Sequence, residues 1–263
     1  MLARQRYERR AQRRAQRDQR TRKWTVSILA AVAVVAVTVG SVFLFGGIGK
    51  KTAAAASATP SATPTATPSA TPTAPVRHCT YTANPPAARK VSFPPTTPDY
   101  QATYRATIKT NRGAIVIDLL NSKATCTVNS FVHLAEQAYF NRTHCHRLTT
   151  ASPYYVLQCG DPTGTGKGGP GYEFASENLA GAKYTAGTVA MANTGQADSN
   201  GSQFFLVYKN SSLPANYTPF GTIVRGLNII QKVAKAGSDN SNGQGDGHPK
   251  EKVEIERVTI KKT

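Results

Sequence analysis

The sequence has few acidic residues, few cysteines and a single tryptophan. Its 263 residues contain 14 Asp plus Glu against 32 Lys plus Arg, a formal net charge of +18, with four Cys and one Trp. Four Cys are too few for a disulfide-dense miniprotein, whereas an apolar content of 40% is sufficient for a hydrophobic core. Such a basic chain first suggests nucleic-acid binding. That interpretation depends on where the charge lies.

The sequence also lacks the signatures of hydrolases and nucleotide-binding proteins. No Ser stands in a G-x-S-x-G turn, and no paired carboxylates flank a polar segment. The glycine-rich run GDPTGTGKGGPG at 160–171 fails as a phosphate-binding loop. Asp161 stands where that motif needs its first Gly, and Gly168 follows Lys167 in place of Ser or Thr. We therefore expect a solvent-exposed loop.

A metal site is not expected either. His144, Cys145 and His146 are consecutive, with Cys159 further along. Consecutive side chains on a strand point to opposite faces, so these three cannot converge on one ion without distortion. We predict neither a metal nor any other cofactor.

The densest positive charge lies in the first 23 residues. Residues 1–23 contain nine Arg and one Lys against Glu8 and Asp18, with almost no apolar residue, which predicts a solvated arm. Residues 24–45 then carry no charge at all. A helix of that length spans about 33 Å, close to the roughly 30 Å of a bilayer core. We predict a single transmembrane helix over 24–45.

A buried core helix and a cleaved signal peptide are the alternatives to this anchor. An arginine-rich arm abuts the run, which disfavours a core helix. Residues 53–56 could offer a cleavage site, but signal-peptide apolar regions span only about 7 to 15 residues. Lys50 and Lys51 are the only basic residues just after the span, so the positive-inside rule places the N-terminus in the cytoplasm and residues from 46 onward outside. The charge of the arm is then a topology signal, with attraction to anionic lipid as the alternative.

A linker and an extension follow the predicted anchor. Residues 52–75 consist only of Ala, Ser, Thr and Pro, so we predict a disordered, extended linker over 46–75, whose hydroxyls could carry sugars. Residues 76–98 remain proline-rich but include Cys79 and two aromatic residues. We expect this part to be an irregular extension packed against the following domain.

Residues 99–263 have the texture of an antiparallel β domain, with short apolar runs between turn-forming residues. Asn111-Arg112-Gly113 is a predicted hairpin turn between the first two strands. Eight strands are expected, over 104–109, 114–120, 144–148, 155–159, 188–192, 203–208, 220–224 and 253–260.

Two helices are predicted from apolar residues at helical spacing. The first has Thr125 or Thr127 as its N-cap, and the second ends at Gly237. Their apolar residues are Val128, Phe131, Leu134, Ala135 and Ala138 in the first, and Leu227, Ile230, Val233 and Ala234 in the second. The fold expected is mainly β, a closed eight-stranded antiparallel barrel capped by two α-helices.

The four cysteines of an exported segment predict two disulfides. All three pairings of Cys79, Cys126, Cys145 and Cys159 remain open. Cys145 and Cys159 are expected on adjacent strands. We expect one bridge to tie the extension to the domain.

Five motifs occur together in residues 100–263. They are CHRL at 145–148, YVLQCGD at 155–161, MAN at 191–193, NGSQFFLVY at 200–208 and NYTPFGTIVRG at 216–226. In this order and spacing they resemble the cyclophilins, a family of peptidyl-prolyl cis/trans isomerases. The resemblance covers about residues 100–263 and implies an eight-stranded antiparallel barrel with two capping helices.

The resemblance also implies site residues. Arg147 matches the catalytic arginine, Gln158 the glutamine that hydrogen-bonds the substrate backbone, and Phe205 the floor of the proline pocket. The other implied substrate contacts are Tyr155, Val156, Ala192, Asn193, Gln203, Leu213 and Tyr217. An X-Pro bond faces a rotation barrier of roughly 18 to 20 kcal/mol that arises from amide resonance. A fixed guanidinium can donate to the prolyl nitrogen only when conjugation is lost, and so favours the transition state.

Three positions depart from the family pattern. Val156 stands where methionine is usual, Ser212 where many members have tryptophan, and Tyr217 where they have histidine. In the family the tryptophan accompanies tight cyclosporin binding, so we expect weak inhibition here.

The expected function is prolyl isomerisation in exported or envelope proteins. The expected partners are proline-containing polypeptides and, through residues 24–45, membrane lipid, with a monomeric soluble domain outside the cytoplasmic membrane. A catalytically weak proline-peptide-binding module is the alternative. Nucleic-acid binding is not expected, because residues 99–263 hold only 17 basic against 12 acidic residues.

Overall fold

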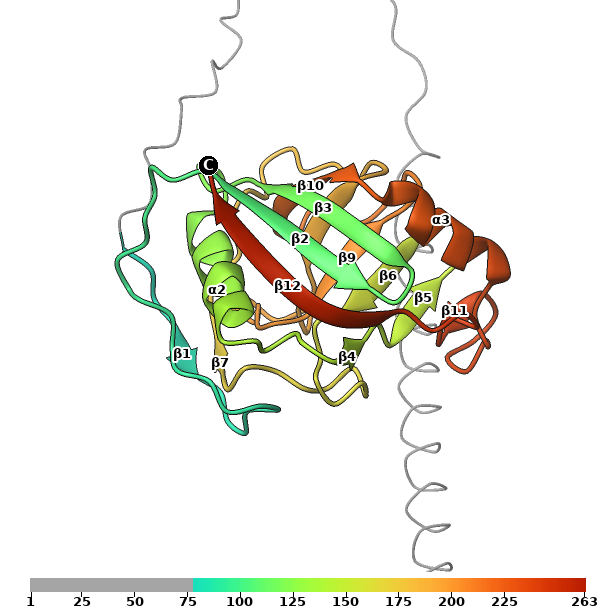
Figure 1. Ribbon diagram of the computed structural model, residues 1–263, viewed down its shortest axis with the longest axis horizontal. Coiled ribbons are helices and arrows are strands. Elements are labelled where there is room, and N and C mark those ends of the chain that lie inside the picture. The colour runs from blue at the N-terminus through green and yellow to red at the C-terminus, as the bar shows by residue number, and fades with distance from the viewer. Residues whose placement is uncertain (1–77) are drawn as a thin grey trace, which may run out of the picture. The chain divides into compact units, whose positions relative to one another are not determined.

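The structure of the protein is a computed structural model that describes residues 78–263 (Figure 1). The predicted arm at 1–23, transmembrane helix at 24–45 and linker at 46–75 lie outside the described residues. Among residues 78–263, no helix has the length and apolar character needed to cross a membrane.

Twelve strands and two helices follow one another along residues 78–263. In chain order they are β1 (Thr82–Ala83), β2 (Tyr104–Thr110), β3 (Gly113–Leu119), α2 (Thr125–Glu136), β4 (Thr143–His144), β5 (Arg147–Thr149), β6 (Val156–Cys159), β7 (Tyr172–Glu173), β8 (Thr188–Met191), β9 (Phe204–Val207), β10 (Pro219–Arg225), α3 (Leu227–Ala236), β11 (Asp246–Gly247) and β12 (Glu254–Lys262).

Ten of these strands form one curled antiparallel sheet, in the order β11-β5-β6-β9-β8-β10-β3-β2-β12-β4. The mainly β fold with two helices is thus confirmed. The expected count of eight strands in a closed barrel is wrong for two reasons. The short strand β11 adds to one edge, and the expected strand 144–148 is divided into β4 and β5.

The division of that strand follows from a change of neighbour. His144 in β4 pairs with β12, whereas Arg147 in β5 pairs with Gln158 of β6. Between them the Cys145 N–H donates to the carbonyl of Val253 and the His146 N–H to that of Gln158. Only two residues separate β4 from β5, so the chain itself links the two flanks of the curled sheet.

The main hydrophobic core fills the interior of the sheet beneath the two helices. Alternate residues of the strands enter it, as in the row Leu148, Leu157, Leu206 and Val189, each at most 1% exposed. Helix α2 contributes Phe131, whose ring stacks on Phe140 with centroids 5.1 Å apart. Figure 1 shows α2 and α3 near opposite ends of the long strands β2, β3 and β12. The first helix ends before Ala138, which has a φ of 56°, and Gly237 ends the second as predicted.

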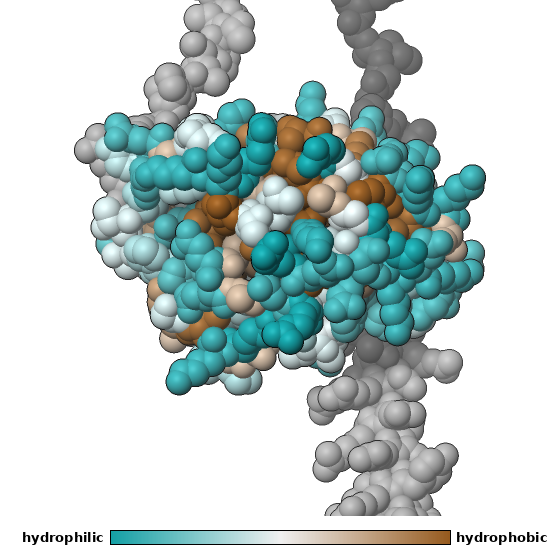
Figure 2. All heavy atoms as spheres, viewed as in Figure 1, coloured by the Kyte–Doolittle hydropathy of each residue, from teal (hydrophilic) through white to brown (hydrophobic). Residues whose placement is uncertain are grey.

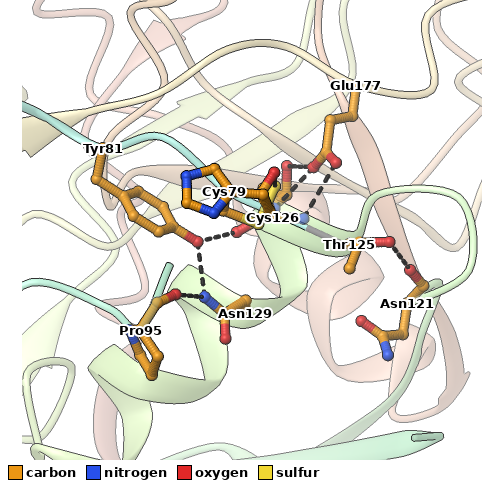
Figure 3. Close-up of a disulfide and its surroundings, with 10 residues drawn as sticks. Cys79, Tyr81, Pro95, Asn121, Thr125, Cys126, Asn129 and Glu177 are labelled. Atoms are coloured by element: carbon orange, nitrogen blue, oxygen red, sulfur yellow. Dashed lines mark hydrogen bonds between the residues drawn. A yellow bond between two sulfur atoms is a disulfide. The ribbon is translucent and has the colours of Figure 1, made fainter. Parts of the chain in front are cut away.

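The N-terminus of α2 is not capped by Thr125 or Thr127, contrary to the prediction. Ala124 is the N-cap and makes no side-chain cap bond, while the Thr125 hydroxyl donates to the carbonyl of Asn121. Glu177, from a distant loop, accepts from the N–H groups of Cys126 and Thr127 at 3.0 and 2.7 Å (Figure 3). A carboxylate placed there satisfies donors that the helix leaves free.

The extension before residue 99 is bound to the domain, as expected. The disulfide Cys79–Cys126 joins it to α2, and the second disulfide links Cys145 with Cys159. Beside the first, the Tyr81 hydroxyl donates to the Cys126 carbonyl at 2.9 Å (Figure 3). These pairings confirm that all four cysteines are bonded and that one bridge ties down the extension.

The outer face of β2, β3 and β12 is predominantly hydrophilic in Figure 2, with smaller hydrophobic areas between the polar residues. Cross-strand ion pairs lie on these strands, including Arg105–Asp118 and Lys109–Glu256. The side chains of both pairs are more than 40% exposed, so this face is a solvated surface rather than a second core. Exposed pairs of this kind contribute little to stability.

Candidate active site

Strand register places four predicted or neighbouring site residues in one row across the sheet. Arg147 lies opposite Gln158, Gln158 opposite Phe205, and Phe205 opposite Ala190. Directly opposed residues of antiparallel strands share a face. The adjacent row, Leu148, Leu157, Leu206 and Val189, is buried in the main core. Because successive side chains of a strand point to opposite faces, the row that contains Arg147 lies on the other face of the sheet. The pairing of β5, β6, β8 and β9 therefore places this row without any loop.

Three polar side chains of the site form a continuous hydrogen-bonded chain. The guanidinium Nη1 of Arg147 donates to Gln158 Oε1 at 3.4 Å. Gln158 Nε2 donates to Gln203 Oε1 at 2.8 Å, and Gln203 Nε2 donates to the carbonyl of Gly168 at 3.0 Å. The glycine-rich loop thus orients Gln203, which orients Gln158, and Gln158 contacts the arginine.

Asp246 accepts from two further donors of Arg147 and was not predicted. Arg147 Nε donates to Asp246 Oδ1 at 2.9 Å, and Nη2 donates to Oδ2 at 2.6 Å. These hydrogen bonds raise the pKa of the Arg147 guanidinium and lower that of the Asp246 carboxyl. Asp246 belongs to β11, which pairs with β5. In the sequence it stands in a run of Gly, Asn, Asp and Ser without local signal, so its partner is visible only once the strands are paired.

Beside this polar chain lies a small apolar cluster, separate from the main core. It contains the predicted pocket residues Val156 and Phe205, respectively 7% and 5% exposed, with Ala192, Leu213 and Tyr217 packed against them. The rings of Phe205 and Tyr217 meet edge to face with centroids 5.4 Å apart. The cluster therefore offers an apolar surface within the same face as Arg147.

Other members of this cluster were missed by the sequence interpretation. They are Ala182, Tyr184, Ala190 and Val207. Ala190 and Val207 could have been found, because each lies two residues from a predicted site residue on the same strand. Tyr184 could not, since it comes from a loop. Its hydroxyl donates to the Tyr217 carbonyl at 2.8 Å and accepts from the Tyr217 N–H at 3.1 Å. These two hydrogen bonds fix the backbone of Tyr217 beside the cluster.

Tyr155 does not join the cluster. Its ring packs against Tyr208, with centroids 6.1 Å apart, and Lys209 Nζ lies 4.5 Å above it. Tyr155 directly precedes β6, and neighbouring side chains of an extended chain point to opposite faces. Tyr155 therefore packs against the main core, whereas Val156 belongs to the apolar cluster of the site.

Ala192 and Asn193 continue the edge of the site beyond β8. The Ala192 N–H donates to the Gln203 carbonyl at 2.9 Å. Asn193 Nδ2 donates to the carbonyl of Asn216 at 2.8 Å, which ties this edge to the loop that carries Tyr217. All predicted site residues except Tyr155 are therefore brought to one face.

The glycine-rich loop is organised by a buried carboxylate rather than being a plain exposed loop. Asp161 is 0% exposed and accepts from five backbone N–H groups between residues 163 and 168. Burial acts to raise the pKa of Asp161, but the hydrogen bonds, with Thr163 first, outweigh it and bring the pKa below its usual range. Of residues 160–171, only Thr163, Thr165, Gly166 and Lys167 are exposed, and the others are half-buried or buried, so the expected solvent-exposed loop is confirmed only in part. The backbone N–H groups that a phosphate would need already donate to the Asp161 carboxylate, whose negative charge would also repel a phosphate. The loop therefore does not have the arrangement of a phosphate-binding loop.

His146, next to Arg147, is buried without a side-chain partner. It is 5% exposed, and neither ring nitrogen has a hydrogen bond. Burial lowers its pKa to about 4. Within residues 78–263, no group of three or more His, Cys, Asp or Glu side chains is arranged to bind a metal ion.

The arrangement suits rotation about an amide bond. The apolar cluster can hold a proline ring, the glutamines and the edge at Ala192 can hold backbone, and Arg147 provides a fixed cation beside them. A donor fixed in this way stabilises charge that develops on the prolyl nitrogen.

Comparisons with known proteins agree with this geometry. The pattern of the family described as cyclophilin type peptidyl-prolyl cis-trans isomerase/CLD matches residues 105–260. The chain is 45% identical over 199 residues to the probable peptidyl-prolyl cis-trans isomerase B of Mycobacterium tuberculosis (strain ATCC 25618 / H37Rv), an alignment covering 70% of this chain and 64% of that protein. It is 48% identical over 189 residues to the protein of that name from Mycobacterium leprae (strain TN), covering 67% and 61%. The alignments thus cover less than two thirds of these relatives.

A solved structure has the same fold. The crystal structure of the Cryptosporidium parvum cyclophilin type peptidyl-prolyl cis-trans isomerase cgd2_1660 superposes with a TM-score of 0.52 at 30% identity, covering 61% of this chain and 99% of that one. A second structure of it was determined in the presence of the dipeptide Ala-Pro. On the family pattern, the relatives and the fold, the chain belongs to the cyclophilin-type peptidyl-prolyl cis-trans isomerase family.

Proposed function

We propose that the protein is a peptidyl-prolyl cis-trans isomerase that acts on X-Pro bonds of exported or envelope polypeptides. The observation that carries the activity is the row of Arg147, Gln158 and Phe205, which sets a fixed guanidinium and an amide beside an apolar surface. The names of the relatives and the Ala-Pro dipeptide used with the C. parvum cyclophilin support the substrate class.

In the mechanism, the proline ring occupies the surface formed by Val156, Phe205 and Tyr217. Gln158 and the strand edge at Ala192 hold the residues that precede the proline, so that one side of the bond is fixed while the other turns. As the amide twists, the prolyl nitrogen regains its lone pair and accepts a hydrogen bond from Arg147. This interaction is stronger in the twisted state than in either planar isomer, so it lowers the barrier.

The activity is tested with a short X-Pro peptide and exchange NMR. Substoichiometric chain should produce cis–trans exchange cross-peaks that are absent from the peptide alone, because unaided isomerisation takes tens to hundreds of seconds. Replacing Phe205 with Ala should raise KM more than it lowers kcat, since the ring contributes binding in all states. An exchange rate unchanged by the wild-type chain would reject the proposal.

The envelope role rests on three features of the chain. Residues 24–45 are an uncharged run preceded by ten basic residues. The two disulfides Cys79–Cys126 and Cys145–Cys159 are typical of an oxidising compartment. We propose a single-pass anchor in the cytoplasmic membrane with the isomerase domain outside. Protease added to intact spheroplasts should then remove the domain, whereas its survival until lysis would contradict this topology.

A catalytically weak proline-binding module is the second candidate. Asp246 favours it, because its carboxylate occupies two donors of Arg147 and competes with the substrate for the guanidinium. In that case the chain should bind an X-Pro peptide, seen as shifts of the peptide resonances, with no exchange cross-peaks.

A further inference from the structure

A cavity of about 450 Å³ lies beside the polar chain of the site. Its lining includes Gln158, Gln203 and Asn193, and also the backbone of the glycine-rich loop from Gly166 to Gly171. The apolar cluster that suits a proline ring does not line it, apart from Ala192. The cavity is therefore a second compartment, reached along the edge where the residues before the proline lie.

One wall of this cavity comes from the extension. Asn84, Pro85 and Pro86 line it. They belong to a segment, residues 82–88, that we call the strap. The family pattern begins only at residue 105, so the strap lies outside it.

The strap is seated on the glycine-rich loop by backbone hydrogen bonds. Strand β1 pairs with β7. Beyond it, the Asn84 N–H donates to the Gly171 carbonyl and the Ala88 N–H to the Gly169 carbonyl, both at 2.8 Å. Asn84 Nδ2 also donates to Glu173 Oε2 at 2.8 Å. Side-chain packing adds to this, because a Cβ at Gly171 would lie 2.9 Å from that of Ala87.

Both ends of the strap are anchored to the region of α2. Before it, the disulfide Cys79–Cys126 fixes the chain. After it, Arg89 Nη1 donates to three carbonyls that follow the helix, of Ala138, Tyr139 and Asn141, at 2.8 to 3.1 Å. The strap is thus a fixed wall whose ordering does not have to be supplied by a ligand.

The groups facing the cavity are mainly neutral and polar. Asn84, Gln158, Asn193 and Gln203 bring amides, and the loop brings peptide groups, while Glu173 and Lys167 supply one charge of each sign. Each of the four amides already donates one N–H within the protein, and its second N–H is left for water or a ligand. An uncharged amide side chain can accept from these donors, whereas an aliphatic side chain would displace their water without replacing its hydrogen bonds.

Resting on the proposed function, we propose that the strap is part of the substrate-binding surface and selects a neutral polar side chain, such as Gln, at a residue that precedes the proline. The strap acts through Asn84 and Pro86, which line the cavity together with Gln203. The selected residue lies two or three positions before the proline.

The test compares binding of peptides that differ at one residue. The dissociation constants of the full chain are measured by NMR titration with Ac-Ala-Gln-Ala-Pro-Ala-NH2 and its Leu counterpart, and with a second pair that places Gln or Leu three residues before the proline. A net hydrogen bond contributes about 0.5 to 1.5 kcal/mol, so Gln should be preferred roughly 2- to 10-fold in one pair.

Three variants assign the preference. The double variant Asn84→Ala/Pro86→Ala removes side-chain atoms of the wall and should bring the Gln:Leu ratio close to one. Gly169→Leu should do the same by filling the cavity, because a Cβ there meets no atom within 4 Å. Lys90→Ala, an exposed position on the same extension outside the cavity lining, is the control and should keep the wild-type ratio.

The outcomes separate this inference from the isomerase function. A ratio of one for the wild type, or a ratio kept in the Asn84→Ala/Pro86→Ala variant, overturns the role of the strap, whatever the catalytic rate. Because the readout is binding, a chain that shows the preference but does not isomerise the peptides refutes the proposed activity and leaves the strap as a selectivity element.

Discussion

The contact between Asp246 and Arg147 makes a quantitative prediction for the variant Asp246→Asn. Asp246 accepts from Nε and Nη2 of the guanidinium at 2.9 and 2.6 Å. In Asp246→Asn one of these two oxygen acceptors becomes an NH2 group, which cannot accept from the guanidinium, so the two-bond contact is lost and at most one such bond remains beside the 3.4 Å contact with Gln158. The arginine would then keep its charge but lose its fixed direction. A positioning role predicts a lower kcat with little change in KM.

The magnitude follows from the exposure of the pair. Hydrogen bonds to charged groups contribute about 1.5 to 3 kcal/mol when buried, and fully exposed pairs about 0 to 1. The two side chains are 41% and 25% exposed, so an intermediate value of about 1 to 2 kcal/mol applies after allowance for solvent screening. That corresponds to a decrease of roughly 5- to 30-fold in kcat.

The assay is steady-state isomerisation of an X-Pro peptide, with Asp118→Asn as the matched control. Asp118 binds Arg105 through the same two types of bond, but on β2 and β3, away from the site. The control should keep wild-type kcat. Since the pKa of Asp246 is below its usual range, wild-type kcat should fall only when the pH falls through that lowered pKa, and Asp246→Asn should lack this limb. An unchanged or higher kcat in Asp246→Asn would refute the reasoning and favour competition for the guanidinium.

Four further predictions concern stability and inhibition. Burial lowers the pKa of His146 from 6.5 to about 4, so between pH 6.5 and pH 4 the unfolded chain binds a proton that the folded chain does not. The contribution of neutral His146 to the free energy of unfolding is therefore full above pH 6.5 and falls by about 3 kcal/mol as the pH falls to 4. Denaturation curves at both pH values should show this loss in the wild type and not in His146→Leu. Replacing Cys79 and Cys126 with Ser should lower the free energy of unfolding by roughly 2 to 4 kcal/mol, since the bridge closes a loop of 47 residues; an unchanged denaturation midpoint would contradict it. Glu177→Ala should cost about 1 to 2 kcal/mol in the same assay, because two N–H donors of α2 lose their acceptor, and a cost near zero would show that water replaces it. Cyclosporin should inhibit weakly, because Ser212 stands at the usual tryptophan position, and low-nanomolar inhibition would contradict this.

Much of the fold was accessible from the sequence because short-range rules determine it. Alternation and turn residues located the hairpin at Asn111-Arg112, and Gly237 ended α3 as its backbone freedom allows. The bend between His144 and Arg147 was not accessible, since it arises when one run pairs with two different neighbours. The cap of α2 was missed for a similar reason. A threonine at the helix start is a local signal, whereas Glu177 is about 50 residues away.

The site shows the same division. Arg147, Gln158 and Phe205 were predicted from the resemblance to the cyclophilins, and strand register places them in one row. Asp246 stands in a glycine- and asparagine-rich loop, and only the pairing of β11 with β5 brings it to the arginine. Long-range partners of this kind depend on the tertiary fold, and a single sequence carries no local mark of them.

The central claim is that the guanidinium of Arg147 accelerates rotation about the X-Pro bond. Its most direct test is the exchange rate of a short X-Pro peptide with the wild-type chain, Arg147→Ala and the surface control Arg105→Ala. Loss of one fixed donor to a developing charge lowers rates by about 100-fold or more. We predict a loss of that size for Arg147→Ala and a wild-type rate for Arg105→Ala, whereas equal rates for all three chains would contradict the assignment.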